Sequence, residues 1–421
     1  MADVNLTTVF DIMRKPYYDN LVQKVFAIAV PIFKRVKQSE SRNIIGPPGH
    51  KKIIMSYETK GVYRGVHAAL ESDNWPIPSD LGFSQAEAQV QYLYMSASLS
   101  MIAANEVSGR GALVEAVQRV ITSLMDAGTL TMGRMIMGDG SGLVATVTSV
   151  SSNVLTVSPI TYFVPGQFIW AFYSTGCPAP TNGRRQQTAD TAYPYAFRID
   201  DVDYENSTIT VQDAGDIAAN DSIYFENCVV YNTTTGAITS KEWTGLSKII
   251  SNTGTLQNID RDSVAWYRSY VNTDTSNRAI SYTLLNSILE TVVYTRQKPI
   301  PEEFVCSPGV FTAFANMLLA ANAPTDSIPT KLGFGKGLKY VYFGDSITFW
   351  GDRCVPANTM YGLRKDAFEF GETIPMGLNR DGGLLKVDGT QAYYKLYGLA
   401  AGQLLGKWPM NLEKVDKITE A

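Results

Sequence analysis

The sequence predicts an α+β chain in which β-structure is arranged around one long helix. Three observations lead to this class. Residues 91–102, and residues 53–66 in the first half of that stretch, alternate apolar and polar side chains, as half-buried strands do. Residues 111–137 instead place apolar side chains at spacings of three and four, which is a helical period. Helical spacing stops at Leu143, and a region rich in Thr, Val, Ser and aromatic residues follows.

Composition narrows the function classes. The 421 residues are enough for two or three domains, and 18% charged residues with a net charge of −4 give no global field for nucleic acid. The four cysteines have no short spacing and there are only two histidines, which argues against a zinc framework or a Ser-His-Asp triad. The apolar run 25–33 contains Pro31 and is too short for a bilayer, which needs ~20 residues. The sequence therefore predicts no catalytic, cofactor or metal site, no membrane contact and a cytoplasmic origin.

The N-terminal region is strongly basic. Residues 14–52 hold nine Lys or Arg and two acidic residues, a local charge of +7. Two interpretations stay open: a solvated arm, or an arm that contacts phosphate or an acidic neighbour. On the second interpretation the candidate DNA-facing or neighbour-facing residues are Lys34, Arg35 and Lys37.

The two alternating stretches predict a long β-hairpin with a broad, Pro-rich tip at residues 67–83. A two-stranded ribbon is marginal alone and its edges invite pairing, so we expect another subunit to cover it. Trp75 lies at the tip, poorly placed for its own core and well placed as an interface anchor. The intersubunit candidates are Trp75, Pro76, Pro78, Leu93, Met95, Leu99 and Met101. The competing prediction is a hairpin folded back on its own domain.

The helix over residues 111–137 leads into "GDGSG", residues 138–142. Gly138 stands where a left-handed residue commonly ends a helix. A phosphate-binding loop must precede a helix, and an EF-hand needs spaced acids and a terminal glutamate, so neither fits. The loop is predicted to turn the chain into the β-rich region.

Residues 143–235 contain an internal repeat. "VTSVSSNVLTV" (147–157) and "IDDVDYENSTITV" (199–211) both read as strand, turn and strand, and the echo continues 54 positions apart. Two related units predict a small inserted β-barrel or sandwich. The acids at 200, 201 and 203 flank a hairpin, where Asp serves turns. Arg184 and Arg185 lie in a polar loop that is either solvated or meets a partner, and "EEFVCSPGVFTAFANMLLAAN" (302–322) predicts a strand followed by a helix.

The order of these parts resembles a known family. A basic arm, a long hairpin, an amphipathic helix leaving into "GDGSGLVATV", a β insertion and "GLSKIISNTGTLQNIDR" (245–261) are similar to major capsid proteins of tailed bacteriophages, with the Hong Kong-type capsid fold. The resemblance covers most of the chain, and residues 341–372 are similar to the family's strand-rich stretch that returns to its peripheral domain.

The resemblance implies a division of the chain into the family's parts. They are an N-terminal arm (1–50), an extended loop (51–105), a peripheral domain with the spine helix (106–142), an inserted β domain (143–235), a peripheral continuation (236–280), an axial domain (281–360) and a C-terminal peripheral part (361–421). With the hairpin starting near residue 50, no room is expected for an N-terminal scaffolding segment. Between Gly61 and Val117 there is no lysine for a crosslink at the loop tip, which leaves only Lys60, well short of it.

The function that the resemblance implies is self-assembly, through hexamers and pentamers, into an icosahedral head shell that encloses double-stranded DNA. The protein would be assembled in the host cytoplasm and end in the virion. Separate portal, scaffolding and decoration proteins are the other partners it implies, and it implies no cofactor. Two rivals remain: another virion component, such as a tail or decoration protein, and a β-rich carbohydrate-active hydrolase with two carboxylates.

Overall fold

The structure is a computed structural model. It describes residues 37–40, 44–45, 51–58, 83–100, 122, 124, 127–173, 183–187, 194–232, 235, 237–320, 338–378, 386–387 and 393–420. The chain divides into two units, each made of segments far apart in sequence. Unit 1 is Met1–Val22, Gln91–Gly245 and Leu378–Leu399, and unit 2 is Gln23–Val90, Leu246–Gly377 and Ala400–Ala421. Within the described residues, no helix is long and apolar enough to cross a membrane.

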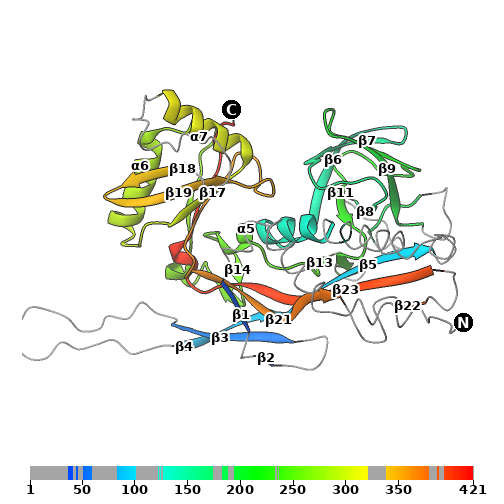
Figure 1. The fold of residues 1–421 in the computed structure, drawn as a ribbon, viewed down its shortest axis with the longest axis horizontal. Coiled ribbons are helices and arrows are strands. Elements are labelled where there is room, and N and C mark those ends of the chain that lie inside the picture. The colour runs from blue at the N-terminus through cyan, green and yellow to red at the C-terminus, as the bar shows by residue number, and fades with distance from the viewer. Residues whose placement is uncertain are drawn as a thin grey trace, which may run out of the picture. The chain divides into compact units, whose positions relative to one another are not determined.

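A closed six-stranded barrel dominates unit 1 (Figure 1). Both predicted hairpins are confirmed, since β6 (Leu143–Ser151) pairs with β7 (Val154–Ser158) and β9 (Phe197–Asp203) pairs with β10 (Thr208–Val211), all antiparallel. Inward side chains at alternate positions, such as Val147, Leu155 and Ile209, are fully buried and form one apolar core. The strands, in the order in which they neighbour one another around the barrel, are β10 (Thr208–Val211), β7 (Val154–Ser158), β6 (Leu143–Ser151), β11 (Ser222–Phe225), β8 (Phe168–Phe172) and β9 (Phe197–Asp203).

The internal repeat of the sequence becomes a pseudo-twofold symmetry of this barrel. Exchanging β6, β7 and β8 with β9, β10 and β11 preserves every neighbour relation. The backbone repeats as well: Gly166 N donates to Ile199 O at 2.7 Å, and Asn220 N donates to Val147 O at 2.7 Å. Gly166 and Asn220 stand 54 positions apart, and both have left-handed φ values, of 86° and 70°. The barrel is thus two copies of one three-strand unit that close on each other.

The helix of unit 1 is described over residues 127–137 and ends where the sequence predicts. The expected left-handed conformation at Gly138 is wrong, because the positive φ values fall at Gly140 and Gly142. Gly138 N still donates to Arg134 O at 2.8 Å, so Gly138 continues the helical bonding pattern. Its carbonyl lies so close to Gly245 that a Cβ there would stand 2.2 Å away. The exit is therefore shaped by a close backbone contact and by two later glycines.

The smaller strands of unit 1 correct the predicted hairpin. β5 (Gln91–Ser100) pairs with β23 (Tyr393–Gly406), not with residues 53–66. β22 (Lys386–Val387) also pairs with β23, and β12 (Val229–Tyr231) pairs with β13 (Ile238–Ser240). The physical reason for the error is that both chain segments alternate with period two, and alternation does not say which strand is the partner.

In unit 2 the actual hairpin is β3 (Lys52–Glu58) with β4 (Phe83–Gln89), antiparallel over seven residue pairs. β2 (Ile44–Ile45) adds to the other edge of β3. β1 (Lys37–Glu40) pairs in parallel with β21 (Phe368–Leu378). Of the tip predicted at residues 67–83, residues 67–82 lie outside the described residues, and Phe83 is the first residue of β4. The strand at the start of the predicted hairpin is confirmed, whereas its return strand is shifted to residues 83–89.

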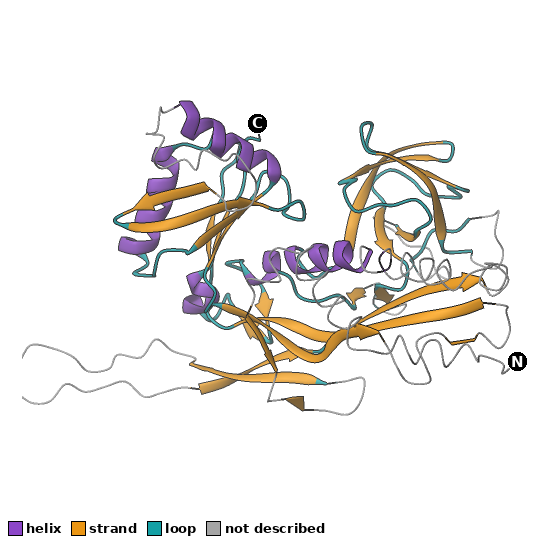
Figure 2. Cartoon of the chain, viewed as in Figure 1, coloured by secondary structure: helices purple, strands orange, loops and turns teal. Residues whose placement is uncertain are grey.

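The largest sheet of unit 2 has six strands, and two helices pack on it (Figure 2). α6 (Tyr282–Glu290) continues as the π-helix η2 (Thr291–Thr295), and α7 (Pro308–Ala320) follows β17 as the sequence predicts. Phe349 stacks on Phe314 of α7 with ring centroids 4.0 Å apart, and both are fully buried. The strands in order are β16 (Tyr270–Asn272), β24 (Glu413–Val415), β20 (Met360–Leu363), β17 (Glu303–Cys306), β19 (Asp345–Gly351) and β18 (Leu338–Tyr342).

Candidate assembly surfaces

Most of the predicted contact residues lie outside the part of the chain that the structure describes. Trp75, Pro76, Pro78, Met101, Lys34 and Arg35 are outside the described residues. Lys37 begins β1, opposite Glu369 in the parallel pairing with β21. Leu99 lies on β5, with its side chain outside the described set. The proposed DNA-facing and tip contacts therefore stay predictions.

Leu93 and Met95 are the two predicted contacts whose surroundings are described. They are 9% and 7% exposed, so the chain itself already covers this face of β5. Tyr94 on the opposite face is 75% exposed, and its ring stacks on Tyr92 with centroids 6.3 Å apart. The predicted alternation is confirmed. The role of Leu93 and Met95 as intersubunit contacts stays a prediction, and the accessible face of β5 is the one that carries Tyr94.

The root of the β3–β4 hairpin is anchored in unit 2. Ile53 is 2% exposed, and its Cδ1 would lie 2.8 Å from a Cβ built on Gly371, so this side chain packs directly against the backbone of β21. Glu87 N donates to Gln257 O at 2.9 Å, and Lys52 Nζ lies 2.7 Å from Glu87 Oε2 on the surface. The hairpin therefore starts from a fixed base.

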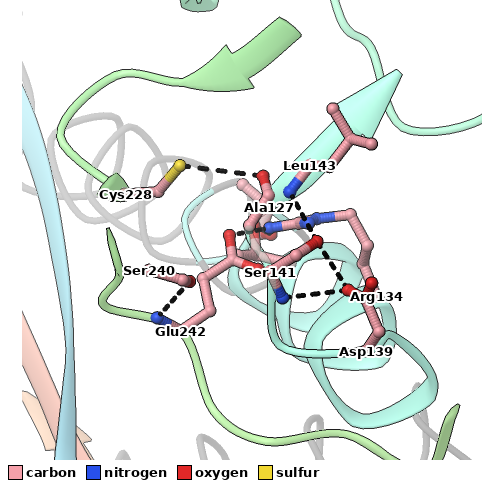
Figure 3. Close-up of polar contacts among 10 residues, drawn as sticks. Ala127, Arg134, Asp139, Ser141, Leu143, Cys228, Ser240 and Glu242 are labelled. Atoms are coloured by element: carbon pink, nitrogen blue, oxygen red, sulfur yellow. Dashed lines mark hydrogen bonds and ion pairs between the residues drawn. The ribbon is translucent and has the colours of Figure 1, made fainter. Parts of the chain in front are cut away.

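The "GDGSG" loop turns the helix into the barrel, as the sequence predicts (Figure 3). Asp139 Oδ1 accepts hydrogen bonds from Ser141 N at 2.9 Å and from Ser141 Oγ at 2.6 Å. Leu143 N, the first residue of β6, donates to Ser141 Oγ at 3.2 Å. The acidic and hydroxyl groups that suggested a ligand loop are thus used to close a turn. Among the described residues, no group of three potential metal ligands lies together.

A buried ion pair joins the helix that precedes the barrel to the chain segment that follows it. Arg134 of the helix is hydrogen-bonded to Glu242, and their side chains are 7% and 4% exposed (Figure 3). The guanidinium also lies over the ring of Phe225, 5.1 Å from its centroid. Cys228 lies nearby, and burial raises the pKa of its thiol to about 12, so it remains protonated at neutral pH. Arg134 and Glu242 are 108 positions apart, so sequence spacing gave no sign of this contact.

Arg261 holds together the segment 245–261, which is one of the stretches on which the resemblance to phage capsid proteins rests. Its guanidinium is fully buried and donates only to backbone carbonyls. Burial lowers the pKa of this side chain, because the charged form loses its hydration. The acceptors are Ile249 O at 3.0 Å, Ser251 O at 2.6 Å, Lys248 O at 2.8 Å and Gly254 O at 3.2 Å. The last carbonyls of α5 (Leu246–Ile249) and the loop after it are thus satisfied by one side chain.

The polar residues of the barrel region have structural roles. Asp203 accepts from Asn206 Nδ2 at 2.6 Å and from two turn amides, and these bonds lower the pKa of its carboxyl. Arg185 forms a bidentate pair with the buried Asp221, at 2.6 and 2.9 Å. Arg184 instead lies between the rings of Trp170 and Tyr195, 4.4 and 4.7 Å from their centroids. Both arginines therefore hold their loop against the barrel.

Unit 2 presents an exposed aromatic pair. Phe343 is 75% exposed at the turn between β18 and β19, and Tyr294 of η2 is 61% exposed, with the rings 6.4 Å apart. Phe343 has a left-handed φ of 49°, which is an outlier for a bulky residue. Large exposed aromatics on a strained turn are typical of contact surfaces.

Several solved structures are similar to this chain over most of its length. The subunit in the cyanophage A-1(L) capsid asymmetric unit is similar over 93% of both chains, with a TM-score of 0.50 and 11% identity. The capsid of the native GTA particle gives a TM-score of 0.45 at 6% identity, over 93% of this chain and 91% of that one. The holo-SrpI encapsulin complex from Synechococcus elongatus PCC 7942 gives 0.40 at 8%, over 92% and 86%. No protein-family model matches the chain, and no curated protein matches it by sequence.

The fold assignment rests on the first of these similarities. The chain has the Hong Kong-type capsid fold, a mixed α and β fold in which β-structure predominates. The fold that the resemblance in the sequence implied is therefore confirmed.

Proposed function

We propose that this chain is a major capsid protein that self-assembles into the icosahedral head shell around the double-stranded DNA of a tailed bacteriophage. The observation that carries the proposal is the similarity to a cyanophage capsid subunit over 93% of both chains. Its partners are copies of itself in hexamers and pentamers, packaged DNA, and separate portal, scaffolding and decoration proteins.

The proposal gives each part of the chain a task. The barrel within 143–235 is an inserted domain, residues 281–360 form the axial domain, and 51–105 form an extended loop that clamps a neighbouring subunit. The exposed pair Tyr294 and Phe343 then belongs to the axial domain and offers an anchor for a second copy. The basic arm, through Lys34, Arg35 and Lys37, faces DNA or acidic patches on a neighbour.

Electron microscopy of the purified full chain is the direct test. Closed shells or ring-shaped capsomers of uniform size support the proposal, whereas a compact monomer at high concentration contradicts it. Density for packaged DNA inside shells from infected cells separates a phage head from an empty protein compartment.

The extended loop has its own test. Deleting residues 68–82 and joining the ends with a short Gly-Ser link leaves the described base of the hairpin intact. We expect a folded subunit with nearly unchanged melting that no longer closes shells. Normal shells from this variant would disprove the clamp, and a misfolded subunit would favour a loop folded back on its own domain.

The arm is tested by reversing Lys34, Arg35 and Lys37 to glutamate. We expect reduced assembly or DNA retention, with a larger effect at low salt because screening is weaker there. Normal packaging at every salt concentration would show that the arm's charge is incidental.

A further inference from the structure

Glu413 occupies an unusual position for a carboxylate. It lies on β24, with Tyr270 of β16 as its register partner on one side and Gly362 of β20 on the other. The residue is 2% exposed, and among the described residues no group donates a hydrogen bond to either of its carboxyl oxygens. An ionised carboxylate buried without donors is strongly disfavoured, while the neutral acid is tolerated far better.

Arg296 is the charged group that acts on Glu413. It follows η2, where Arg296 N donates to Thr291 O at 3.0 Å in the π-helical pattern, five residues back. Its Nη2 donates to Arg268 O at 2.8 Å, while its Nη1 is buried without an acceptor among the described residues. No ion pair within 4 Å joins Arg296 to Glu413 in the described structure. A buried acid and a partly unsatisfied cation therefore stand near each other unpaired.

The other charged and titratable groups near this position have their own contacts. Lys298 Nζ donates to Met410 Sδ at 3.2 Å, and burial, with Arg296 nearby, lowers the pKa of this lysine. Lys414, the next residue of β24, lies 3.4 Å from Asp416 and alternates to the other face of the strand. Tyr270 on β16 lies beneath Arg296, whose guanidinium carbon is 5.5 Å from its ring centroid. Gly362 on β20 leaves room for the carboxyl, since a Cβ there would lie 3.1 Å from Glu413 Oε2.

We propose that Glu413 and Arg296 form a proton-operated latch in unit 2. The neutral carboxyl keeps β24 seated between β16 and β20, and loss of its proton loosens that strand. Strands β16, β20 and the C-terminal residues 416–420 respond with it, because Tyr270 N donates to Leu412 O and Ile418 N donates to Asn358 O. The pH of the surroundings thereby sets the order of this sheet, independently of whether the chain assembles.

The direction of the effect follows from linkage. Burial raises the pKa of Glu413 from 4.5 to about 8, with Arg296 opposing the shift. A raised pKa means that the folded state holds the proton more tightly than the unfolded state. Stability contributed by this proton is complete below the ordinary glutamate pKa and is lost as the pH rises towards about 8. Within that window the unfolding constant rises by up to roughly tenfold per pH unit.

The test uses urea unfolding of unassembled full-length subunits across that window, followed by tryptophan fluorescence and by hydrogen exchange at residues 413–415. The wild type should lose stability as the pH rises, and Glu413→Gln, which cannot ionise, should lose that part of the slope. Glu302→Gln is the matched control, because it makes the same chemical change on a side chain that is 42% exposed. We expect this control to keep the wild-type slope. Equal slopes for the wild type and Glu413→Gln would overturn the proposal.

A second variant changes the other residue of the latch, Arg296. This test remains informative even if Glu413→Gln fails to fold. Arg296→Met removes the positive charge that favours ionisation, so the loss of stability should move to higher pH. A purely structural role for Arg296 would lower stability at every pH without moving the transition. A transition that stays in place or moves to lower pH would overturn the proposal.

Discussion

Replacing Arg261 with methionine tests whether one buried guanidinium holds the segment 245–261 together. Methionine keeps most of the side-chain volume and removes the nitrogens that make all four hydrogen bonds. The wild-type residue is fully buried and supplies four hydrogen bonds to backbone carbonyls. Methionine can replace none of them, so the change isolates the polar contribution from the packing contribution.

The expected size of the loss follows from these contacts. Hydrogen bonds from a charged donor contribute about 1.5–3 kcal/mol each, and the desolvation of a buried cation offsets several kcal/mol of their sum. Ile249 O and Ser251 O keep second donors, Ser269 Oγ at 3.2 Å and Ser269 N at 3.3 Å, which softens the loss. We expect the free energy of unfolding to fall by about 2–4 kcal/mol, a large part of the ~5–15 kcal/mol typical of a domain.

Urea unfolding of the unassembled subunit measures this loss. Arg261→Lys should be intermediate, because lysine keeps the charge but lacks the planar fork that reaches several carbonyls. Arg268→Met is the matched control: Arg268 also bonds only carbonyls, Arg261 O at 2.6 Å and Asp262 O at 2.7 Å, but is less buried. It should cost about 1 kcal/mol. An Arg261→Met subunit within about 0.5 kcal/mol of the wild type, or equal to the control, would refute the reasoning.

Three further predictions concern unit 1. Arg134→Met alone should destabilise by ~3–5 kcal/mol because it strands the buried Glu242, and adding Glu242→Leu should restore most of the loss; a double variant no better than the single one would contradict this. Asp221→Asn should lower the melting temperature of the barrel more than Asp200→Asn, since Asp221 is buried and doubly bonded to Arg185. A fragment of residues 143–235 should show β-type circular dichroism and melt cooperatively, because its core is internal to it; a disordered fragment would count against a separate domain.

Local sequence patterns predicted several elements of this fold. The alternation in 91–102 correctly placed Leu93 and Met95 on one face and Tyr94 on the other, because strand geometry sends successive side chains to opposite faces. That the chain itself covers Leu93 and Met95 was not predicted. The two hairpins of the barrel and their repeat at 54 residues were likewise predicted from the sequence. In the structure this repeat corresponds to a pseudo-twofold symmetry of the barrel. The turn at residues 138–142 was predicted from Gly138 after the helix, and in the structure Asp139 Oδ1 closes it by accepting a hydrogen bond from Ser141 N.

Local sequence patterns do not show which distant segments of the chain a strand or a side chain contacts. β5 pairs with a strand about 300 residues later, and period-two alternation is the same whichever strand lies alongside. No local sequence pattern marks Arg261 or Glu413 for burial. Only the folded chain buries them, one among carbonyls that satisfy it and one without a donor. Burial and partnership arise from segments brought together across the whole chain, so the energetic roles of these two residues are set by tertiary structure.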